Sequence, residues 1–411
     1  MSSRPSDTPA SETVPAASPA EPRQGPPPPT LLCVCNYPAN TGYAWDFIEG
    51  LYVQVARRLA ARGVRTLVAY PRIDAPPRTL AGSPATGVVL DASLGSVASI
   101  RAVAAFVRRE HVETIYFTDR PVWTPAYLFL RASGVRRIVV HDHSSGSRAA
   151  PTGVRKLIKQ GLVRLPGVCA DAVVAVSDYV ARRQVEVGLV PKARVTRIWN
   201  GMEVPPESAL PKGRPLHEAL GLDPDRPAIA CACRAAAEKG VPVLLRAFDL
   251  LMRDWPTEGP RPVLVYMGNG PTFDDIERCR ASLASRDDII LTGYRTDAVT
   301  LVAGADVCAM PSLWQDALPL AVMQPMAVGR PVVASAVGGI PEMIADGETG
   351  LLVPPDDPPA LAAALARLIR DPALRARFGT AARARVQALF APASTLDALT
   401  GVVGAGFTKA S

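Results

Sequence analysis

The side chains best suited to chemistry gather around one short helix, which the sequence pattern predicts between about residues 319 and 328. Pro319 suits the first helical position, and a glycine ends the segment. The free amides of the first residues, Leu320 among them, would point out of the helix start, where a phosphate is stabilised. Asp316 lies just before that end, and Gln324 shares a helix face with Leu320. Eight residues of helical rise cover about 12 Å, so the spacing suits a long ligand with a diphosphate at the helix start and hydroxyl groups near Asp316 and Gln324.

Two basic residues follow another apolar stretch. Arg234 and Lys239 come after the expected strand Ala228–Ala232 and before the expected helix Val241–Met252. Two fixed cations at a strand end can neutralise a diphosphate in place of a metal ion. Ordinary surface ion pairs are the alternative role for both side chains.

Further strand ends in the second half of the chain carry glycine, aromatic and basic residues. Gly268 and Gly270 follow one apolar strand, and Tyr294 and Arg295 follow the next. An open parallel sheet builds its ligand crevice from such strand ends, glycine turns and helix starts. We therefore expect these residues at one edge of a parallel sheet.

The first half of the chain begins with a similar unit. The strand Leu31–Cys35 leads into a polar loop that contains Gly42, and the loop leads into a helix over Phe47–Gly63. Gly42 follows the carboxyl end of the first strand, where ligands bind in α/β sheets. The alternative is an ordinary turn glycine.

Two histidines follow a later strand of the first half. The strand Arg137–Val140 runs into His141, Asp142 and His143. A metal site is one interpretation, although two histidines with one aspartate between them form a weak ligand set. Solvated loop histidines are another. Strand alternation does not decide which of the two faces inward, and His141 is favoured because it is nearer the strand.

These motifs resemble those of the retaining, nucleotide-sugar-dependent glycosyltransferases of family 4. In that family two glutamates separated by seven residues occupy the frame in which this chain has Asp316 and Gln324. One glutamate contacts the donor sugar and the other the ribose. The segment CRAAAEKG, which holds Arg234 and Lys239, matches the family's arginine and Lys-Gly pattern, and the GNGP turn at Gly268 is similar to the family's GDGP turn.

The resemblance implies an α/β protein with the GT-B fold, in which two Rossmann-like domains turn their parallel sheets toward an interdomain cleft. It implies transfer of a sugar, with retention of configuration, from a nucleoside diphosphate sugar to a hydroxyl acceptor such as a glycan, a lipid-linked sugar or a small molecule. No metal cofactor is expected. The implied catalytic residues are Asp316, Arg234, Lys239 and His141, the last near the 6-hydroxyl of the donor sugar. The implied donor-binding residues are Gly42, Gly268, Gly270, Tyr294, Arg295, Pro319, Leu320 and Gln324.

Other classes of protein fit the sequence less well. A nucleotide-sugar-binding protein with weak or no turnover remains the main alternative, because Asp316 and Gln324 replace the paired glutamates. A dinucleotide-dependent dehydrogenase is disfavoured, since no G-x-G-x-x-G follows the first strand. Nucleic-acid binding is disfavoured as well, because the basic residues behind the net charge of +7 are scattered.

Length and composition indicate two domains. With 411 residues, 48% of them hydrophobic, the chain can bury two full cores. The expected division is a disordered tail over 1–30, an acceptor domain over 31–204, a linker over 205–215, a donor domain over 216–390, and a tail over 391–411 that returns to the first domain. The first 30 residues lack the apolar core of a secretory signal, which favours a cytoplasmic protein. The seven cysteines fit buried reduced thiols, with a metal or redox site as the alternative.

One basic helix points to a further partner. The segment Val154–Leu165 places Arg155, Lys156, Lys159 and Arg164 among leucines and valines. A basic amphipathic helix is typical of peripheral contact with an anionic membrane, here the inner surface. Simple solvation of an exposed helix is the alternative.

Overall fold

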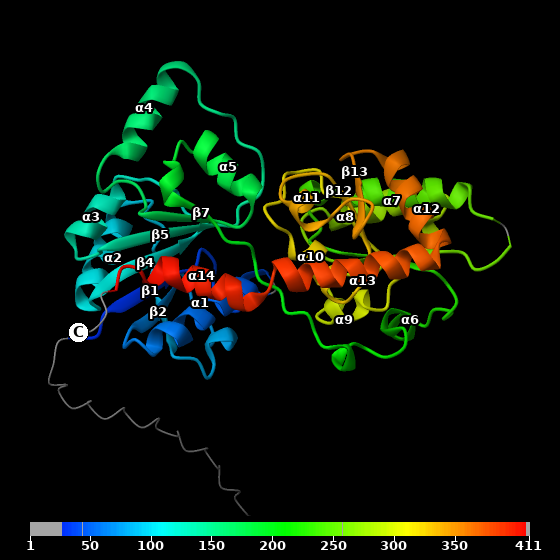
Figure 1. Ribbon diagram of the computed structural model, residues 1–411, viewed down its shortest axis with the longest axis horizontal. Coiled ribbons are helices and arrows are strands. Elements are labelled where there is room, and N and C mark those ends of the chain that lie inside the picture. The colour runs from blue at the N-terminus through cyan, green and yellow to red at the C-terminus, as the bar shows by residue number, and fades with distance from the viewer. Residues whose placement is uncertain (1–26, 43, 257, 408–411) are drawn as a thin grey trace, which may run out of the picture.

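The protein folds into two α/β domains side by side, each built on a parallel sheet between helices (Figure 1). The structure is a computed structural model that describes residues 27–42, 44–256 and 258–407. The predicted disordered tail therefore lies almost wholly outside the described residues.

The first domain contains a seven-stranded parallel sheet in the order β3-β2-β1-β4-β5-β6-β7. Its central strands are nearly continuous apolar runs because helices cover both faces of the sheet. The strands are β1 (Thr30–Val34), β2 (Arg65–Tyr70), β3 (Ala85–Val89), β4 (Val112–Thr118), β5 (Arg137–Asp142), β6 (Ala172–Ala175) and β7 (Val195–Arg197). The helices are α1 (Ala44–Ala60), α2 (Val97–Arg109), α3 (Ala126–Ala132), α4 (Gly153–Arg164) and α5 (Asp178–Glu186).

The second domain contains a six-stranded parallel sheet in the order β10-β9-β8-β11-β12-β13. Its strands are β8 (Ala228–Ala232), β9 (Val263–Met267), β10 (Ile289–Leu291), β11 (Val307–Met310), β12 (Val332–Ser335) and β13 (Gly350–Val353). Its helices are α6 (Pro215–Leu220), α7 (Val241–Arg253), α8 (Phe273–Ala281), α9 (Ala298–Val302), α10 (Leu320–Ala327), α11 (Ile340–Met343), α12 (Pro358–Arg370) and α13 (Pro372–Leu389).

The strand order reverses once in each sheet. In the first domain the chain builds outward from β1 to β3 and then returns to the other side of β1 with β4. In the second domain the same change occurs between β8 and β11. Loops diverge at such points and leave a crevice at the carboxyl ends of the strands. The topology therefore predicts a ligand site at these two strand ends.

The last helix, α14 (Pro392–Gly404), packs on α1 of the first domain. The Nε of Arg58 lies 3.4 Å from the carboxylate of Asp397, and Arg62 donates to the carbonyls of Gly404 and Phe407. The C-terminal segment thus crosses back from the second domain and closes the core of the first.

Residues 372–404 are together long and apolar enough to span a membrane by length and composition alone. Of their most apolar stretch of 18 residues, 33% is buried inside the protein. The run is two helices, because Ala391 between them has extended backbone angles. Arg383 and Arg385 of α13 donate to the carbonyls of Ala327 and Met343 in the second domain. We interpret the run as the connection between the two domains.

Candidate functional site

A cavity of about 450 Å³ lies between the two domains, at the carboxyl ends of strands from both sheets. The first domain contributes Thr41, Gly42 and Trp45, which follow β1. The structure brings six of the predicted donor-site residues to this cavity: Gly42, Arg234, Gly268, Tyr294, Arg295 and Gln324. Thr41, in the loop after β1, and Trp45, in the first turn of α1, were not identified from the sequence, since neither belongs to a motif.

The two arginines of the cavity differ in charge balance. Arg295 pairs with Asp297 at 2.8 and 2.6 Å, so its charge is already compensated. In the part of the chain that the structure describes, no carboxylate lies within ion-pairing distance of the Arg234 guanidinium. Arg234 is therefore the cation of this cavity that an anionic ligand would neutralise. Tyr294, with 59% of its surface exposed, offers an open ring face beside it.

Asp316 and Lys239 form an ion pair close to the cavity. The Nζ of Lys239 lies 2.6 Å from Oδ1 of Asp316, and Asp316 is 3% exposed. The carboxylate also accepts hydrogen bonds from the hydroxyls of Ser312 and, at 3.4 Å, of Ser145 from the first domain. The carboxylate of Asp316 is thus buried, and it accepts hydrogen bonds from donors of both domains.

A glycine turn holds the loop that carries Asp316. Gly338 has φ +59°, and a Cβ at this position would lie 2.0 Å from the carbonyl oxygen of Asp316. The next amide, that of Gly339, donates to the same carbonyl at 2.7 Å. Any side chain at Gly338 would displace the loop, so the Gly-Gly pair positions Asp316.

The helix α10 begins one residue later than predicted. Pro319 is the N-cap, with φ −73° and ψ 125°, and the helix starts at Leu320. Free amides were expected at the first residues of this helix. The amide of Val322 is instead engaged, because it donates to the carbonyl of Pro319 at 3.1 Å. Ala321 and Gln324 of this helix line the cavity. The predicted residues that do not line it are Asp316, Lys239, Gly270, Pro319, Leu320 and His141.

His141 lies elsewhere than predicted. Its side chain is 2% exposed, and Nδ1 is 2.6 Å from the hydroxyl of Tyr116 inside the first domain. Burial lowers the pKa of His141 well below its ordinary value, and it lowers that of neighbouring His143 to about 4. His141 is thus buried at the end of β5, where it contacts Tyr116 of the neighbouring strand β4.

The carboxylate of Glu342 joins the two domains. Glu342, in α11 of the second domain, accepts the amides of Asp178 and Tyr179 at 2.8 Å each. It also accepts the indole N–H of Trp199 at 3.1 Å. A carboxylate at the start of α5 satisfies free amides and interacts favourably with the helix dipole. Sequence reasoning missed this contact because its partners are far apart in the chain.

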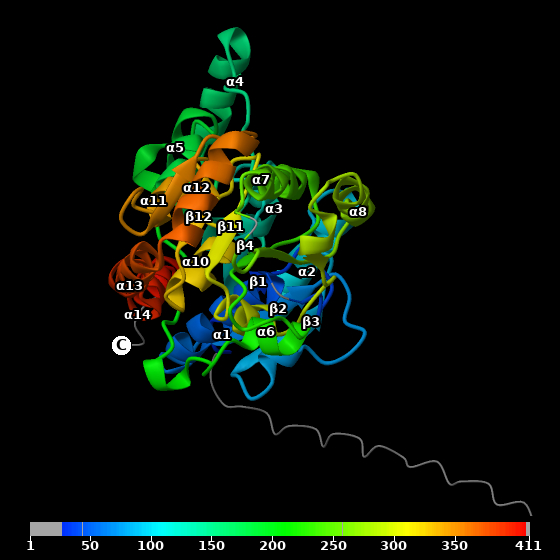
Figure 2. The same cartoon turned by 90° about the vertical axis from the view of Figure 1, so that its right-hand side faces the viewer.

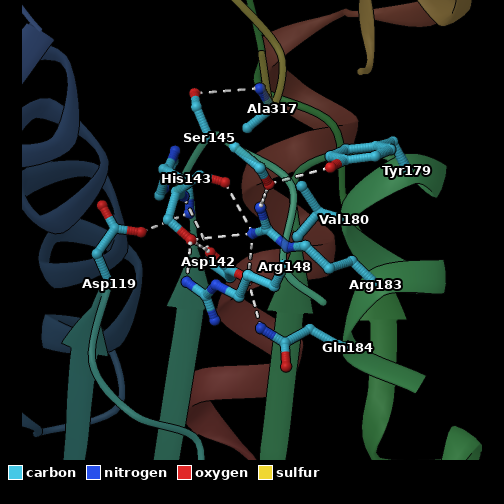
Figure 3. Close-up of polar contacts among 12 residues, drawn as sticks. Asp119, Asp142, His143, Ser145, Arg148, Tyr179, Val180, Arg183, Gln184 and Ala317 are labelled. Carbon is cyan, nitrogen blue, oxygen red and sulfur yellow. Dashed lines mark hydrogen bonds and ion pairs between the residues drawn. The ribbon is translucent and has the colours of Figure 1, made fainter. Parts of the chain in front are cut away.

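A buried ion pair underlies the loop after β5 (Figure 3). Arg183 lies 2.9 Å from Asp142, and both side chains are 4% exposed. Arg183 also donates to the carbonyls of Ser144 and Gly146, while the hydroxyl of the intervening Ser145 accepts the amide of Ala317 at 3.4 Å. The pair thus supports the segment of the first domain that contacts the Asp316 loop.

The described residues contain no group of three or more His, Cys, Asp or Glu side chains that could hold a metal ion. All seven cysteines are free. Cys231 lies on β8 and Cys233 directly follows it; their Sγ atoms lie 3.8 Å apart, and Cys233 lines the interdomain cavity.

Both halves of the chain match family models of glycosyltransferases. Residues 214–385 match the family described as Glycosyl transferases group 1, and residues 49–204 match Glycosyltransferase Family 4. A relative from Mycolicibacterium smegmatis is named GDP-mannose-dependent alpha-(1-6)-phosphatidylinositol monomannoside mannosyltransferase. It is 30% identical over 286 residues, which are 67% of this chain and 72% of the relative.

Solved structures share the fold. A glycosyltransferase from Rickettsia africae superposes with a TM-score of 0.75 at 19% identity, over 92% of this chain and 98% of the other. HepE from Anabaena, in complex with UDP, gives a TM-score of 0.71 at 18% identity, over 92% and 100%.

Proposed function

The chain belongs to glycosyltransferase family 4 and has the GT-B fold, and from this premise we propose that it transfers a sugar with retention of configuration from a nucleoside diphosphate sugar to a hydroxyl acceptor. The observation that carries the proposal is the interdomain cavity, in which Arg234 lacks a carboxylate partner within the described chain and lies with Tyr294 and Gln324. An uncompensated cation beside an open aromatic ring and an amide suits a nucleotide with a diphosphate.

The chemistry expected of these groups is stabilisation of the leaving diphosphate. Negative charge accumulates on the diphosphate as the bond to the sugar breaks, and preorganised cations and amides lower the energy of that state. Arg234 would bind the diphosphate from the cavity wall. Lys239 would approach from the Asp316 side, with the amides of Leu320 and Ala321 at the start of α10. The acceptor hydroxyl would attack from the same face as the leaving group, which gives retention.

Asp316 supports this step indirectly in our proposal. Its carboxylate bonds Lys239 rather than open space, so it fixes the position of the ammonium group. Contact between Asp316 and the sugar hydroxyls, as the family resemblance implies, would require the carboxylate to exchange Ser145 or Ser312 for the ligand.

A panel of donors tests the proposal. The M. smegmatis relative is named for GDP-mannose, so GDP-mannose is the first donor to try, followed by UDP- and ADP-sugars. We expect one class of nucleotide to raise the melting temperature and its sugar to appear in a product detected by mass spectrometry. Donor binding without product from any acceptor would instead favour a binding protein, and no binding by any nucleotide would contradict the proposal.

We also propose that α4 contacts an anionic membrane. The helix stands away from the rest of the molecule in both views (Figures 1 and 2). Its apolar residues Val154, Leu157 and Ile158 are 70%, 67% and 57% exposed. Arg155, Lys156 and Arg164 are also exposed, whereas the fourth predicted cation, Lys159, is half-buried and donates to the carbonyl of Val187. An apolar stripe flanked by cations suits the surface of an anionic bilayer.

Vesicle binding tests this contact. Replacing Leu157 and Ile158 with serine should abolish sedimentation with phosphatidylserine vesicles, because it removes the apolar stripe without changing charge. Sedimentation that is equal for wild type and variant would contradict the role of α4.

A further inference from the structure

Two thiols meet at the wall of the interdomain cavity. Cys231 lies on β8 and is 1% exposed, whereas Cys233 directly follows this strand, lines the cavity and is partly exposed. Side chains two residues apart along a strand share one face of the sheet, and the two Sγ atoms lie 3.8 Å apart. One sulfur of the pair is therefore accessible from the cavity, and the other is buried next to it.

The position of Cys233 differs from that of the other cysteines. Cys33 and Cys35 have the same spacing at the end of β1, but both are buried and neither lines the cavity. Cys308 lines the cavity, but it is 3% exposed, and burial raises its pKa to about 12. Cys279 is partly exposed and does not line the cavity. Among the seven cysteines, all of which the structure describes, Cys233 alone combines partial exposure with a place in the cavity.

The surroundings of Cys233 suit a thiol that reacts with an oxidant. Such cysteines are typically partly exposed and in electropositive surroundings. Cys233 shares the cavity with the next residue, Arg234, whose charge no carboxylate of the described chain compensates. The hydrogen bond with Cys233, together with burial, raises the pKa of Cys231 well above its ordinary value. Cys233 is therefore the sulfur that an oxidant would attack first, and Cys231 is the thiol that would react with it afterwards.

The spacing of the pair allows a disulfide. Two residues of strand rise are about 6.6 Å, and Cα separations in disulfides reach about 6.8 Å. An S–S bond is about 2.05 Å long, so the two Sγ atoms, now 3.8 Å apart, would move about 1.8 Å closer. A bridge near this geometric limit is of the labile kind that serves regulation rather than permanent stabilisation.

Closing this gap would disturb Arg234. The amide of Cys233 donates to the carbonyl of Met267 at 3.2 Å, and its carbonyl accepts the hydroxyl of Tyr266 at 3.0 Å. A Cβ at Gly268 would lie 1.9 Å from the same carbonyl oxygen. Because the backbone of Cys233 has no room to move on this side, the shift must be taken up by the following loop, which begins with Arg234.

We propose that Cys233 and Cys231 form a reversible disulfide when hydrogen peroxide oxidises the protein, and that this bridge weakens donor binding. The O–O bond of the peroxide breaks as one oxygen joins the sulfur of Cys233, which gives a sulfenic acid and one water. The sulfur of Cys231 then attacks, the S–S bond forms and the S–O bond breaks, and the hydroxide leaves with the thiol proton of Cys231 as a second water. The bridge stands on the two thiols alone, whereas its effect rests on the proposed donor site.

Peptide mass spectrometry tests the bridge. Trypsin cuts after Lys212 and Arg234, and the two arginines between them precede proline, so residues 213–234 form one peptide with Cys231 and Cys233 as its two cysteines. After treatment with hydrogen peroxide, this peptide should lose two hydrogen atoms and stop reacting with iodoacetamide. Dithiothreitol should restore the mass and the reactivity. An unchanged mass with full reactivity after peroxide would overturn the inference.

Single variants test the order of the two steps. Dimedone traps sulfenic acids, and it should label Cys233 in Cys231→Ser after peroxide. It should leave Cys231 unlabelled in Cys233→Ser, because that thiol is 1% exposed. Labelling of Cys231 without labelling of Cys233 would overturn the assignment of Cys233 as the sulfur that is attacked.

Nucleotide affinity tests the consequence. Calorimetry with GDP and UDP compares the wild type when reduced, oxidised, and treated with dithiothreitol after oxidation. We expect oxidation to weaken binding at least about tenfold, as for the loss of one charge-assisted contact, and dithiothreitol to restore it. Restoration distinguishes the bridge from oxidation of Met267, which lines the same cavity, because methionine sulfoxide is reduced by dedicated enzymes.

Cys279→Ser is the matched control, because it removes a partly exposed thiol that does not line the cavity. Its nucleotide affinity should respond to peroxide and dithiothreitol as that of the wild type does. Equal affinity of the reduced and the bridged protein would overturn the effect on donor binding.

The two readouts separate this inference from the function on which its second part rests. If the reduced wild type binds no nucleotide, the proposed function fails, while the mass of the peptide still decides whether the bridge forms. If the reduced wild type binds nucleotide and residues 213–234 never form the bridge, the inference alone fails.

Discussion

The ammonium group of Lys239 lies 2.6 Å from the carboxylate of Asp316, and this pair joins the loop after β8 to the loop before α10. Both loops belong to the second domain, while Ser145 of the first domain contacts the same carboxylate. The pair therefore fixes a cation beside the crevice at the point where the two domains meet.

Removal of Lys239 should slow transfer strongly. We expect Lys239→Ala to lower kcat/KM by about 100-fold or more, because a preorganised charge near the leaving group is lost. The same change leaves Asp316 buried without its cation, and breaking a buried pair costs roughly 3–5 kcal/mol. The double variant Lys239→Ala/Asp316→Asn should recover most of the free energy of unfolding but none of the activity. Near-normal turnover in either variant would exclude the role of Lys239 in the leaving-group step.

Arg234 should govern nucleotide affinity. We expect Arg234→Gln to weaken nucleoside diphosphate binding by about tenfold to 100-fold, which corresponds to one charge-assisted contact. Arg246→Gln, an exposed position on α7, is the control. Isothermal titration with UDP and GDP measures both, and unchanged affinity in Arg234→Gln would place the diphosphate elsewhere.

Gln324 tests the ribose contact. Because an ionised acceptor makes hydrogen bonds about twice as strong as a neutral one, Gln324→Glu should tighten donor binding if ribose hydroxyls lie beside α10. The Kd of the preferred nucleotide provides the measurement. An unchanged or higher Kd would indicate that this wall of the cavity contacts a group other than the ribose.

Much of the second domain could be predicted from the sequence, since its strands are short apolar runs bounded by glycine and proline. The strand Ala228–Ala232 and the helix start near residue 320 appear where the pattern placed them, to within one residue. The edge strand β3 was missed because it contains a glycine and is only partly buried. An edge strand has a neighbouring strand on one side only, so fewer of its side chains are buried and its apolar sequence pattern is weaker.

The site was predictable to the extent that it depends on strand ends. Residues such as Gly42 and Arg234 meet in one cavity because carboxyl ends of parallel strands converge. The contacts of Glu342 with α5, of Ser145 with Asp316, and of His141 with Tyr116 depend on packing between distant segments. No local pattern encodes those contacts, which is why the sequence did not predict that His141 contacts Tyr116.

Asp119 should make stability depend on pH in a defined direction. Its folded pKa of about 7 lies above the ordinary value of 3.8, mainly because of burial. Between these values the folded state holds a proton that the unfolded state releases, so the contribution of this group falls as pH rises toward 7. The free energy of unfolding of Asp119→Asn, relative to that of the wild type, should therefore be higher at pH 8 than at pH 5.

Urea denaturation of the wild type and Asp119→Asn at pH 5 and pH 8 measures this difference. The comparison cancels the contributions of His141 and His143, whose lowered pKa values act in the opposite direction. A constant difference in the free energy of unfolding at the two pH values would contradict the raised pKa.

Glu342 should hold the domains together. Glu342→Gln replaces a carboxylate that accepts two amides at the start of α5 with a neutral amide, and such interactions contribute about 1 kcal/mol. We expect a larger radius of gyration by small-angle X-ray scattering and faster proteolysis between the domains. Glu348→Gln, at an exposed position, should behave as the wild type, and identical scattering from all three proteins would show that the contact does not restrain the domains.

The central claim is that a sugar leaves a nucleoside diphosphate and joins the acceptor on the same face. Proton NMR of the product formed from an α-linked donor, such as GDP-α-mannose or UDP-α-glucose, tests it directly through the configuration of the new anomeric centre. The wild type should give an α-linked product, and Lys239→Ala/Asp316→Asn should give almost none. A β-linked product, or the same yield from the double variant, would contradict retention with Lys239 at the leaving group.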